Sequence, residues 1–142
     1  GQGDLDPVSL IDMKASPPRV VNTVTVGQTP EGIKISPDGR YVAVTVMNGT
    51  DKPKSSPFFN ESGLLQVYAR SGMQLSKIGE ERIGKWCQGI AWNAKSSVIL
   101  AQCVAEEEIH VVRLQGVTSK GLARAGTIKT KGGPSGIRTA ER

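Results

Sequence analysis

The stretch TPEGIKISPDGR, at residues 29–40, decides the fold because it recurs twice more in altered form. Residues 86–97 read WCQGIAWNAKSS, and residues 133–139 read GPSGIRT. The Gly-Ile step of the three copies falls at positions 32, 89 and 136, so the repeats are offset by 57 and 47 residues. Between the copies, short β-branched runs alternate with turn residues, and each repeat therefore predicts a set of short strands.

Repeats of this length, rich in short strands, indicate β-propeller blades or similar stacked β units. We predict an all-β protein made of propeller blades, each a four-stranded antiparallel sheet. We place the end of one blade in residues 1–28, a whole blade in 29–84, a second in 85–131 and the start of a third in 132–142. A closed propeller has roughly 4–8 blades of about 45 residues, and this chain supplies about two and three-quarters. We therefore expect a fragment of a larger ring, or a chain that pairs with other chains to complete one.

Eleven strands are predicted, with the Gly-Ile strand innermost in each blade. The sequence Ser-Pro-Asp-Gly at 36–39 predicts the turn after the third strand, since proline presets φ, aspartate bonds to the local backbone and glycine accepts a positive φ. The predicted strands cover residues 8–13, 20–26, 33–36, 41–47, 65–69, 75–83, 90–93, 98–104, 109–114, 123–129 and 136–139.

The composition excludes some classes of protein. The chain has 142 residues, 37% of them hydrophobic, a net charge of +5 and a mean hydropathy of -0.24. It has no apolar run near the ~20 residues of a membrane helix, so we expect no membrane span. Residues 113–142 carry seven basic side chains against Glu141 alone, which fits either a nucleic-acid contact or a solvated strand face. Since no aromatic residues interleave with them, we favour the solvated face and expect no nucleic-acid partner.

An insertion at residues 48–63 accounts for the longer first offset. It is polar apart from Phe58 and Phe59, and loops of this length tend to be functional or disordered. The two aromatic side chains either fold back on the sheet, which is the commoner outcome, or offer a protein partner a hot spot. We take Phe58 and Phe59 as the candidate partner-binding residues.

The two cysteines are placed by the repeat. If Ile35 faces Tyr41 across the turn, the same register shifted by 57 residues sets Cys87 opposite Cys103 on antiparallel strands. Opposed Cα atoms lie ~4.5–5.5 Å apart, within the disulfide range, so a disulfide forms in an oxidising compartment. The alternative is a pair of buried free thiols among small neighbours. Two thiols without a supporting histidine do not make a metal site, and we expect neither metal nor cofactor.

His110, the single histidine, follows three glutamates. A histidine beside carboxylates can act as a base or a ligand, but we favour an edge-strand residue below an acidic turn. Trp86 and Trp92 are expected to pack between sheets. We name no catalytic residue, because the sequence has no Ser-His-Asp order, no HExxH motif and no phosphate-binding glycine pattern.

Residues 8–13, 20–27 and 30–46 together resemble the YVTN-type β-propeller repeat. The shared pattern is a strand ending in a Val-Gly step, a Pro-x-Gly-Ile strand, Ser-Pro-Asp-Gly and an aromatic-plus-aliphatic strand. The second copy departs from it at its turn, which reads Asn-Ala-Lys-Ser at 93–96. The resemblance implies a ring with a central channel, partner or ligand contacts on its loop faces, and export to a bacterial periplasm or cell surface.

These observations predict a non-catalytic propeller module for binding or scaffolding, whose partner is a protein or the further copies or segments that complete the ring. The alternative is part of a propeller enzyme, lactonase-like or quinoprotein-dehydrogenase-like, with its active site in blades outside this sequence. The resemblance covers both, because similar blades occur in scaffold proteins and in enzymes.

Overall fold

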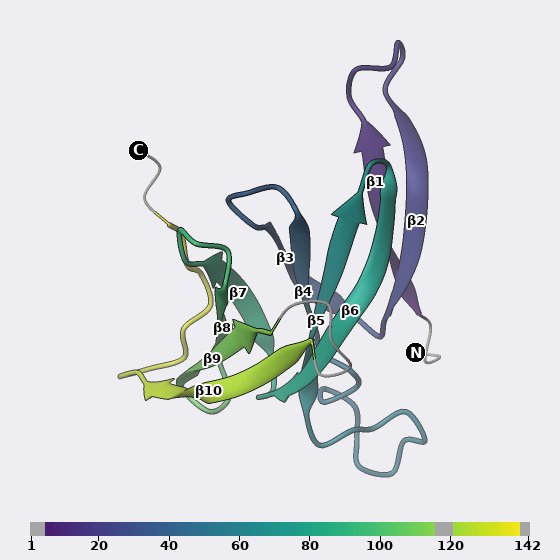
Figure 1. The fold of residues 1–142 in the computed structure, drawn as a ribbon. Helices are drawn as coiled ribbons and strands as arrows, with labels where there is room; N and C mark the ends of the chain where they lie inside the picture. The colour runs from purple at the N-terminus through teal and green to yellow at the C-terminus, as the bar shows by residue number, and fades with distance from the viewer. Residues whose placement is uncertain (1–4, 116–120, 140–142) are drawn as a thin grey trace.

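The computed structural model describes residues 5–115 and 121–139 and contains three antiparallel sheets (Figure 1). The described residues include ten strands and no helix, so the prediction of an all-β, antiparallel fold is confirmed. The strands are β1 (Asp6–Asp12), β2 (Arg19–Gly27), β3 (Pro30–Ile35), β4 (Tyr41–Val46), β5 (Gly63–Ser71), β6 (Gln74–Ile83), β7 (Cys87–Trp92), β8 (Val98–Cys103), β9 (Glu108–Leu114) and β10 (Leu122–Lys129).

Each sheet joins strands that follow one another in the chain. β1 and β2 form a hairpin, β3-β4-β5-β6 form the first sheet and β7-β8-β9-β10 form the second sheet. Ten of the predicted strands are present, with ends that differ by at most three residues. The prediction of an eleventh strand at residues 136–139 is wrong, because this segment has no strand beside it to which it is hydrogen-bonded in the described chain.

The turn at residues 36–39 forms as its sequence predicts. The Gly39 amide donates to the Ser36 carbonyl at 2.8 Å, and Gly39 has a φ of 70°. The Asp38 carboxylate accepts bonds from the Ser36 hydroxyl at 2.6 Å and the Arg40 amide at 3.0 Å. These donors hold the pKa of Asp38 well below its usual range. The strands leave the turn in a different register from the predicted one, since Ile35 pairs with Val42 and not with Tyr41.

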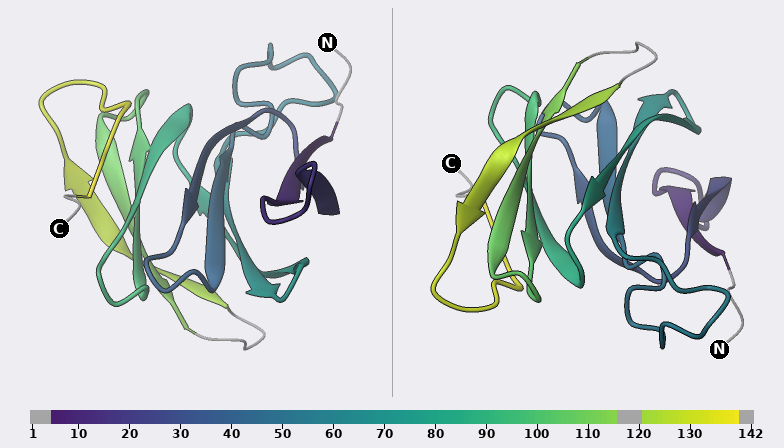
Figure 2. Two further views of the ribbon diagram at one scale, coloured as in Figure 1. Left: turned by 90° about the horizontal axis from the view of Figure 1, so that it is seen from above. Right: turned by 90° about the horizontal axis from the view of Figure 1, so that it is seen from below.

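The three sheets stand side by side (Figure 2), and an apolar core fills each of the two spaces between them. Alternation along β4 explains why the first sheet serves both, because successive side chains point to opposite faces. Val42 and Val44 face the hairpin, whereas Ala43 faces the second sheet. The core on the hairpin side is Val26, Val42, Val44, Val46, Tyr68 and Leu75. The core between the sheets includes Leu65, Val67, Ile83, Ile90, Trp92, Ile99 and Val112.

Trp92 fixes the contact between the two four-stranded sheets. Its indole Nε1 donates to the Lys34 carbonyl at 3.1 Å, and its ring stacks on Tyr41 with the centroids 6.2 Å apart. Trp86 does not share this role, because its side chain is exposed. The prediction that both tryptophans pack between sheets is therefore right for Trp92 and wrong for Trp86, which precedes β7 and has a φ of 51°.

Candidate functional site

The loop between β4 and β5 is held to the first sheet at both ends. The Met47 amide donates to the Thr29 carbonyl at 2.9 Å, and the Asn48 side chain donates to the Ser62 carbonyl at 3.0 Å. The Asn60 side chain donates to the Asn48 carbonyl at 2.9 Å and so joins the two ends. A loop closed by three such bonds has a defined shape, in keeping with a functional loop.

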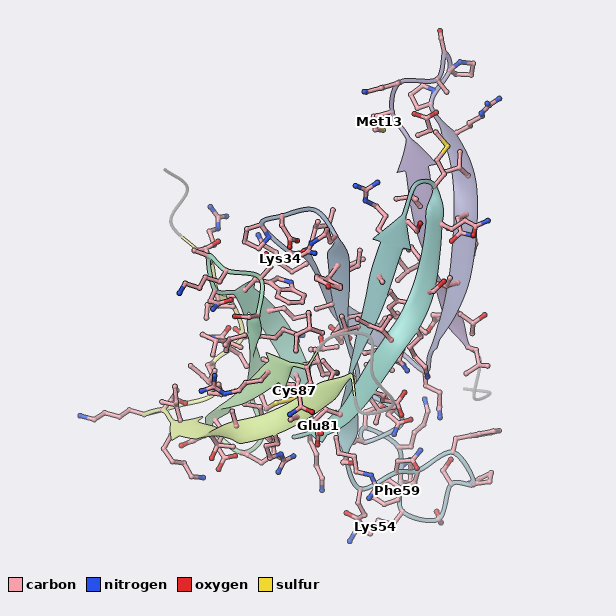
Figure 3. The ribbon with its side chains drawn as sticks, viewed as in Figure 1. Met13, Lys34, Lys54, Phe59, Glu81 and Cys87 are labelled. Carbon is pink, nitrogen blue, oxygen red and sulfur yellow. A yellow bond between two sulfur atoms is a disulfide. The ribbon has the colours of Figure 1, made fainter. Side chains whose placement is uncertain are left out.

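Figure 3 labels Phe59 in this loop, beside Lys54, and the Phe58 backbone lies against Gly49 at the start of the loop. The Phe58 carbonyl accepts a bond from the Gln28 side chain at 3.4 Å and packs so closely on Gly49 that a Cβ there would collide with it. The Phe58 side chain is 38% exposed, whereas Phe59 is half-buried. Both aromatics are therefore partly covered, and Phe58 is the more exposed of the two.

Charged side chains surround the loop. Glu61 lies 3.7 Å from the Lys54 ammonium and 3.6 Å from the Lys85 ammonium. These pairs are exposed, and such pairs contribute little to stability. Beside them is a polar cleft of about 460 Å³ lined by Asn48, Asn60, Glu61, Ser62, Leu64, Glu80 and Arg82. The loop therefore offers an aromatic side chain next to a polar, charged rim, which is the usual make-up of a protein-binding surface.

Sequence reasoning selects the two phenylalanines but misses the residues that position them. Gln28, Asn48, Gly49 and Asn60 hold the loop through side-chain bonds or close backbone contact. The available signal is the Asn48-Gly49 pair, a turn dipeptide, and both residues indeed have positive φ values of 57° and 79°. The contribution of Gln28 has no local signal, because it comes from the turn that precedes β3.

Cys87 and Cys103 face each other in the β7–β8 pair and form a disulfide, and Figure 3 labels Cys87 in the second sheet. Both side chains belong to the core between the sheets. The bond therefore ties the start of β7 to the end of β8 from inside the protein.

His110 lies in β9, which pairs with β8 on one side and β10 on the other, so the prediction of an edge-strand position is wrong. Its ring is buried, and its Nε2 lies 3.5 Å from the nearest Glu108 oxygen. Neither ring nitrogen has a hydrogen-bond partner in the described part of the chain. Burial, aided by the charge of Arg124, lowers the pKa of His110 and keeps the ring neutral.

Two basic residues of the segment 113–142 have acidic partners within the described chain. The Lys129 ammonium lies 2.7 Å from a Glu108 carboxylate oxygen, and the Arg124 guanidinium donates to the Arg82 carbonyl at 2.6 Å and lies 4.0 Å from Glu81. Acidic side chains of the described chain therefore balance the charges of these two residues. Lys120, Arg142 and Glu141 lie outside the described residues.

Residues 5–115 and 121–139 contain no group of three His, Cys, Asp or Glu side chains that could hold a metal ion. They also contain no helix of the length and hydropathy needed to cross a membrane.

Comparison with known proteins places the fold but not the family. No family model and no curated protein matches the sequence. Among solved structures, the chain is similar to a chain of hydrazine synthase from Kuenenia stuttgartiensis, with a TM-score of 0.62 and 15% sequence identity. The similarity covers 92% of this chain and 44% of that chain, so this chain spans less than half the length of its structural neighbour. At this identity the likeness concerns the fold alone.

Proposed function

We propose that this chain is a section of a YVTN-type β-propeller that acts as a non-catalytic protein-binding module. The packing of the sheets supports the propeller: each four-stranded meander lies face to face with its neighbour, and the repeat-equivalent first strands β3 and β7 lie side by side. In this arrangement the hairpin is the outer half of one blade, and the two sheets are the next two blades. Strands from the same or another polypeptide complete the ring.

The exposed side chain of Phe58 on a loop that the sheet holds in place is the observation that carries the binding role. Aromatic side chains presented from a fixed position lose little conformational entropy on binding and often dominate an interface. Gln28 and Gly49 hold the Phe58 backbone, so its position does not depend on a partner. We propose that Phe58 enters a pocket of a protein partner and that Lys54, Lys85 and Glu61 form the rim.

The Cys87–Cys103 disulfide supports an exported protein, because such bonds persist in oxidising compartments such as the bacterial periplasm and cell surface. We propose that the loop meets its partner there.

A photo-crosslinking phenylalanine analogue at position 58 tests the binding role in cells that make the protein. We expect one adduct of defined mass, and none from the same analogue at Ile128, an exposed residue of the second sheet. Phe58→Ser is expected to release the same partner from the purified native protein, whereas Ile128→Ser retains it. Adducts of equal yield at both positions, or a partner retained by Phe58→Ser, would contradict the proposal.

The enzyme alternative predicts a different result. A lactonase-like or quinoprotein-dehydrogenase-like protein shows lactone hydrolysis, a bound metal or a quinone cofactor when purified with all of its blades. The name of the structural neighbour does not favour this reading, since a fold shared at 15% identity does not transfer chemistry. Metal analysis and the absorption spectrum of the native protein separate the two functions.

A further inference from the structure

Equivalent residues of the two sheets differ sharply in burial. In the first sheet Ile33 pairs with Val44 and Ile35 with Val42; in the second, Ile90 pairs with Ala101 and Trp92 with Ile99. Adding 57 to the number of each residue in the first-sheet pairs gives the corresponding residue of the second-sheet pairs. Ile90 and Trp92 are 5% and 2% exposed, whereas Ile33 and Ile35 are 57% and 61% exposed. The same face is covered in one sheet and open in the other.

The first two strands of the first sheet, β3 and β4, lie against β7 and help to cover Ile90 and Trp92. Tyr41 and Ala43 of β4 belong to the core that buries Trp92, and Lys34 of β3 accepts its indole hydrogen bond. In front of the first sheet stands the hairpin, which takes the place of an outer strand pair. In the described residues, no pair of inner strands packs over Ile33 and Ile35.

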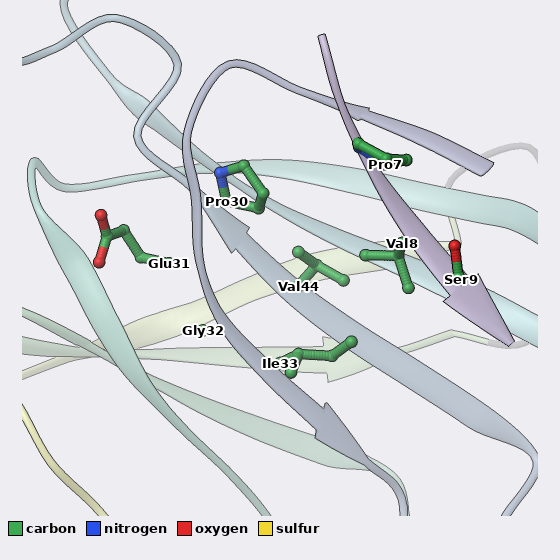
Figure 4. A pocket seen from close by; sticks show the side chains of 8 residues that line it. All are labelled: Pro7, Val8, Ser9, Pro30, Glu31, Gly32, Ile33 and Val44. Carbon is green, nitrogen blue, oxygen red and sulfur yellow. The ribbon is translucent and has the colours of Figure 1, made fainter. Parts of the chain in front are cut away.

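A groove lies at this uncovered face of the first sheet (Figure 4). It has a volume of about 290 Å³ and lies between β1 and β3, with Val8, Ile33 and Val44 among its lining residues. β1 pairs with β2 on one edge, and its other edge pairs with no strand in the described residues. Such an edge is a ready template for an added strand.

The rim of the groove includes a carboxylate. Glu31 lines the groove and also accepts a bond from the Gln88 side chain of the second sheet at 3.1 Å. Gln88 is the residue equivalent to Glu31 one repeat later. If a strand of another blade covers β3 in the same way, its residue equivalent to Gln88 lies near Glu31. The Glu31 carboxylate accepts hydrogen bonds, so it favours a donor at that position.

We propose that this groove binds a two-stranded β-hairpin, whose second strand pairs with the free edge of β1 and whose first strand lies over β3. The inference rests on the proposed propeller function and names the surface at which the ring is completed. The hairpin has an aliphatic face toward Ile33, Ile35 and Val44, and a Gln, Lys or Arg side chain that donates to Glu31. It continues the packing that β3 and β4 already make with β7.

The chain itself supplies a probe of this chemistry. A synthetic peptide of residues 86–104, oxidised so that Cys87 and Cys103 are joined, is a closed copy of the β7–β8 hairpin. It carries Gln88 at the donor position and presents Ala91 and Leu100, which alternate with the core residues, on its other face. The covalent link matters because a free hairpin is only marginally stable in water.

Titration of the peptide into the isotope-labelled chain tests the proposal by NMR. We expect shift changes at Val8, Ile33 and Ile35 and protection of the β1 amides that do not pair with β2. Ile33→Asp is expected to weaken binding by about tenfold or more, because burial of an isoleucine is worth at least that factor. Ile128→Asp, on the second sheet, is the matched control and leaves binding unchanged. A peptide with Gln88→Glu binds more weakly because it places two carboxylates together.

Three results would overturn the proposal. The first is no shift change in the groove at about 1 mM peptide, a concentration that detects even weak binding. The second is a set of changes confined to the outer face of the second sheet. The third is self-association of the chain, by sedimentation, that Ile33→Asp abolishes, since the occupant is then a second copy. None of these bears on Phe58, so crosslinking at that residue still tests the proposed function.

Discussion

Cys87 lies opposite Cys103 because a β-bulge corrects the register that the neighbouring turn sets. In the first sheet Ile35 pairs with Val42, one residue away from the predicted Tyr41, and a register shift between Pro30 and Gly32 then sets Pro30 opposite Val46. The second sheet repeats this shift between Cys87 and Ile90. The turn shifts the pairing by one residue from the predicted register, and the bulge shifts it back by one residue. The two shifts cancel, so the two cysteines lie opposite each other.

Removal of the disulfide is expected to destabilise the protein. The bond joins residues 16 apart, and closing a loop of this size is worth about 3 kcal/mol in the chain-entropy model. We expect Cys87→Ala with Cys103→Ala to lower the free energy of unfolding by about 2–4 kcal/mol, measured by urea denaturation. Wild-type protein with a reductant is the control and should fall by a similar amount. Equal stability of the oxidised and reduced proteins would contradict this expectation.

The two tryptophans form a matched pair of test sites. Trp92→Ala is expected to cost about 3–5 kcal/mol, because it leaves a cavity between the sheets. Trp92→Phe keeps most of the volume but leaves the Lys34 carbonyl without its 3.1 Å donor, at about 1 kcal/mol for the lost bond. Trp86→Ala, at the exposed position, should change stability by no more than about 0.5 kcal/mol. Thermal or chemical denaturation gives all three values, and a large loss for Trp86→Ala would show a role outside the described contacts.

Gly49 is expected to control the position of Phe58. An alanine Cβ would meet the Phe58 carbonyl, and the φ of 79° adds about 1–2 kcal/mol of backbone cost. Gly72→Ala is the control, because Gly72 has a φ of 59° and open space around its Cα. We expect Gly49→Ala to lose more stability than Gly72→Ala and to accelerate hydrogen exchange of the Phe59 amide, which bonds to the Ser56 carbonyl. Equal effects of the two substitutions would mean that the contact with Phe58 is not important.

Stability is expected to fall in mild acid through His110. Burial and Arg124 lower the pKa of this histidine, against which Glu108, Glu106 and Glu81 act more weakly. The unfolded chain therefore takes up a proton near a pKa of about 6.5 while the folded chain resists protonation, and stability decreases as the pH falls below that value. Unfolding free energies measured between about pH 7.5 and 5 should show this slope. His110→Gln, which cannot titrate, should flatten it, and an unchanged slope in that variant would assign the effect to other groups.

The pattern of the sequence predicted most of the strands because its signals are local. β-branched runs, the Ser-Pro-Asp-Gly turn and the glycines that end strands act within a few residues, and they set where β1 to β10 begin and end. The predictions that were wrong concern burial and strand position, which depend on what surrounds a residue. Trp86 and Trp92 lie six positions apart in one repeat, yet one is exposed and the other lies in the core. The sequence predicts an edge strand for His110, and only the position of β10 beside β9 makes β9 an interior strand.

The sequence by itself determined that this protein is all-β, with repeated antiparallel sheets and a long polar loop that carries Phe58 and Phe59. These features follow from side-chain alternation and turn chemistry, which need no distant contact. Only the tertiary structure decided that Phe58 is exposed while Phe59 is half-buried, that a bulge sets Cys87 against Cys103, and that Ile33 is open where Ile90 is covered. Each of these depends on which sheet or loop packs against the residue, and burial is a property of that neighbour as much as of the residue.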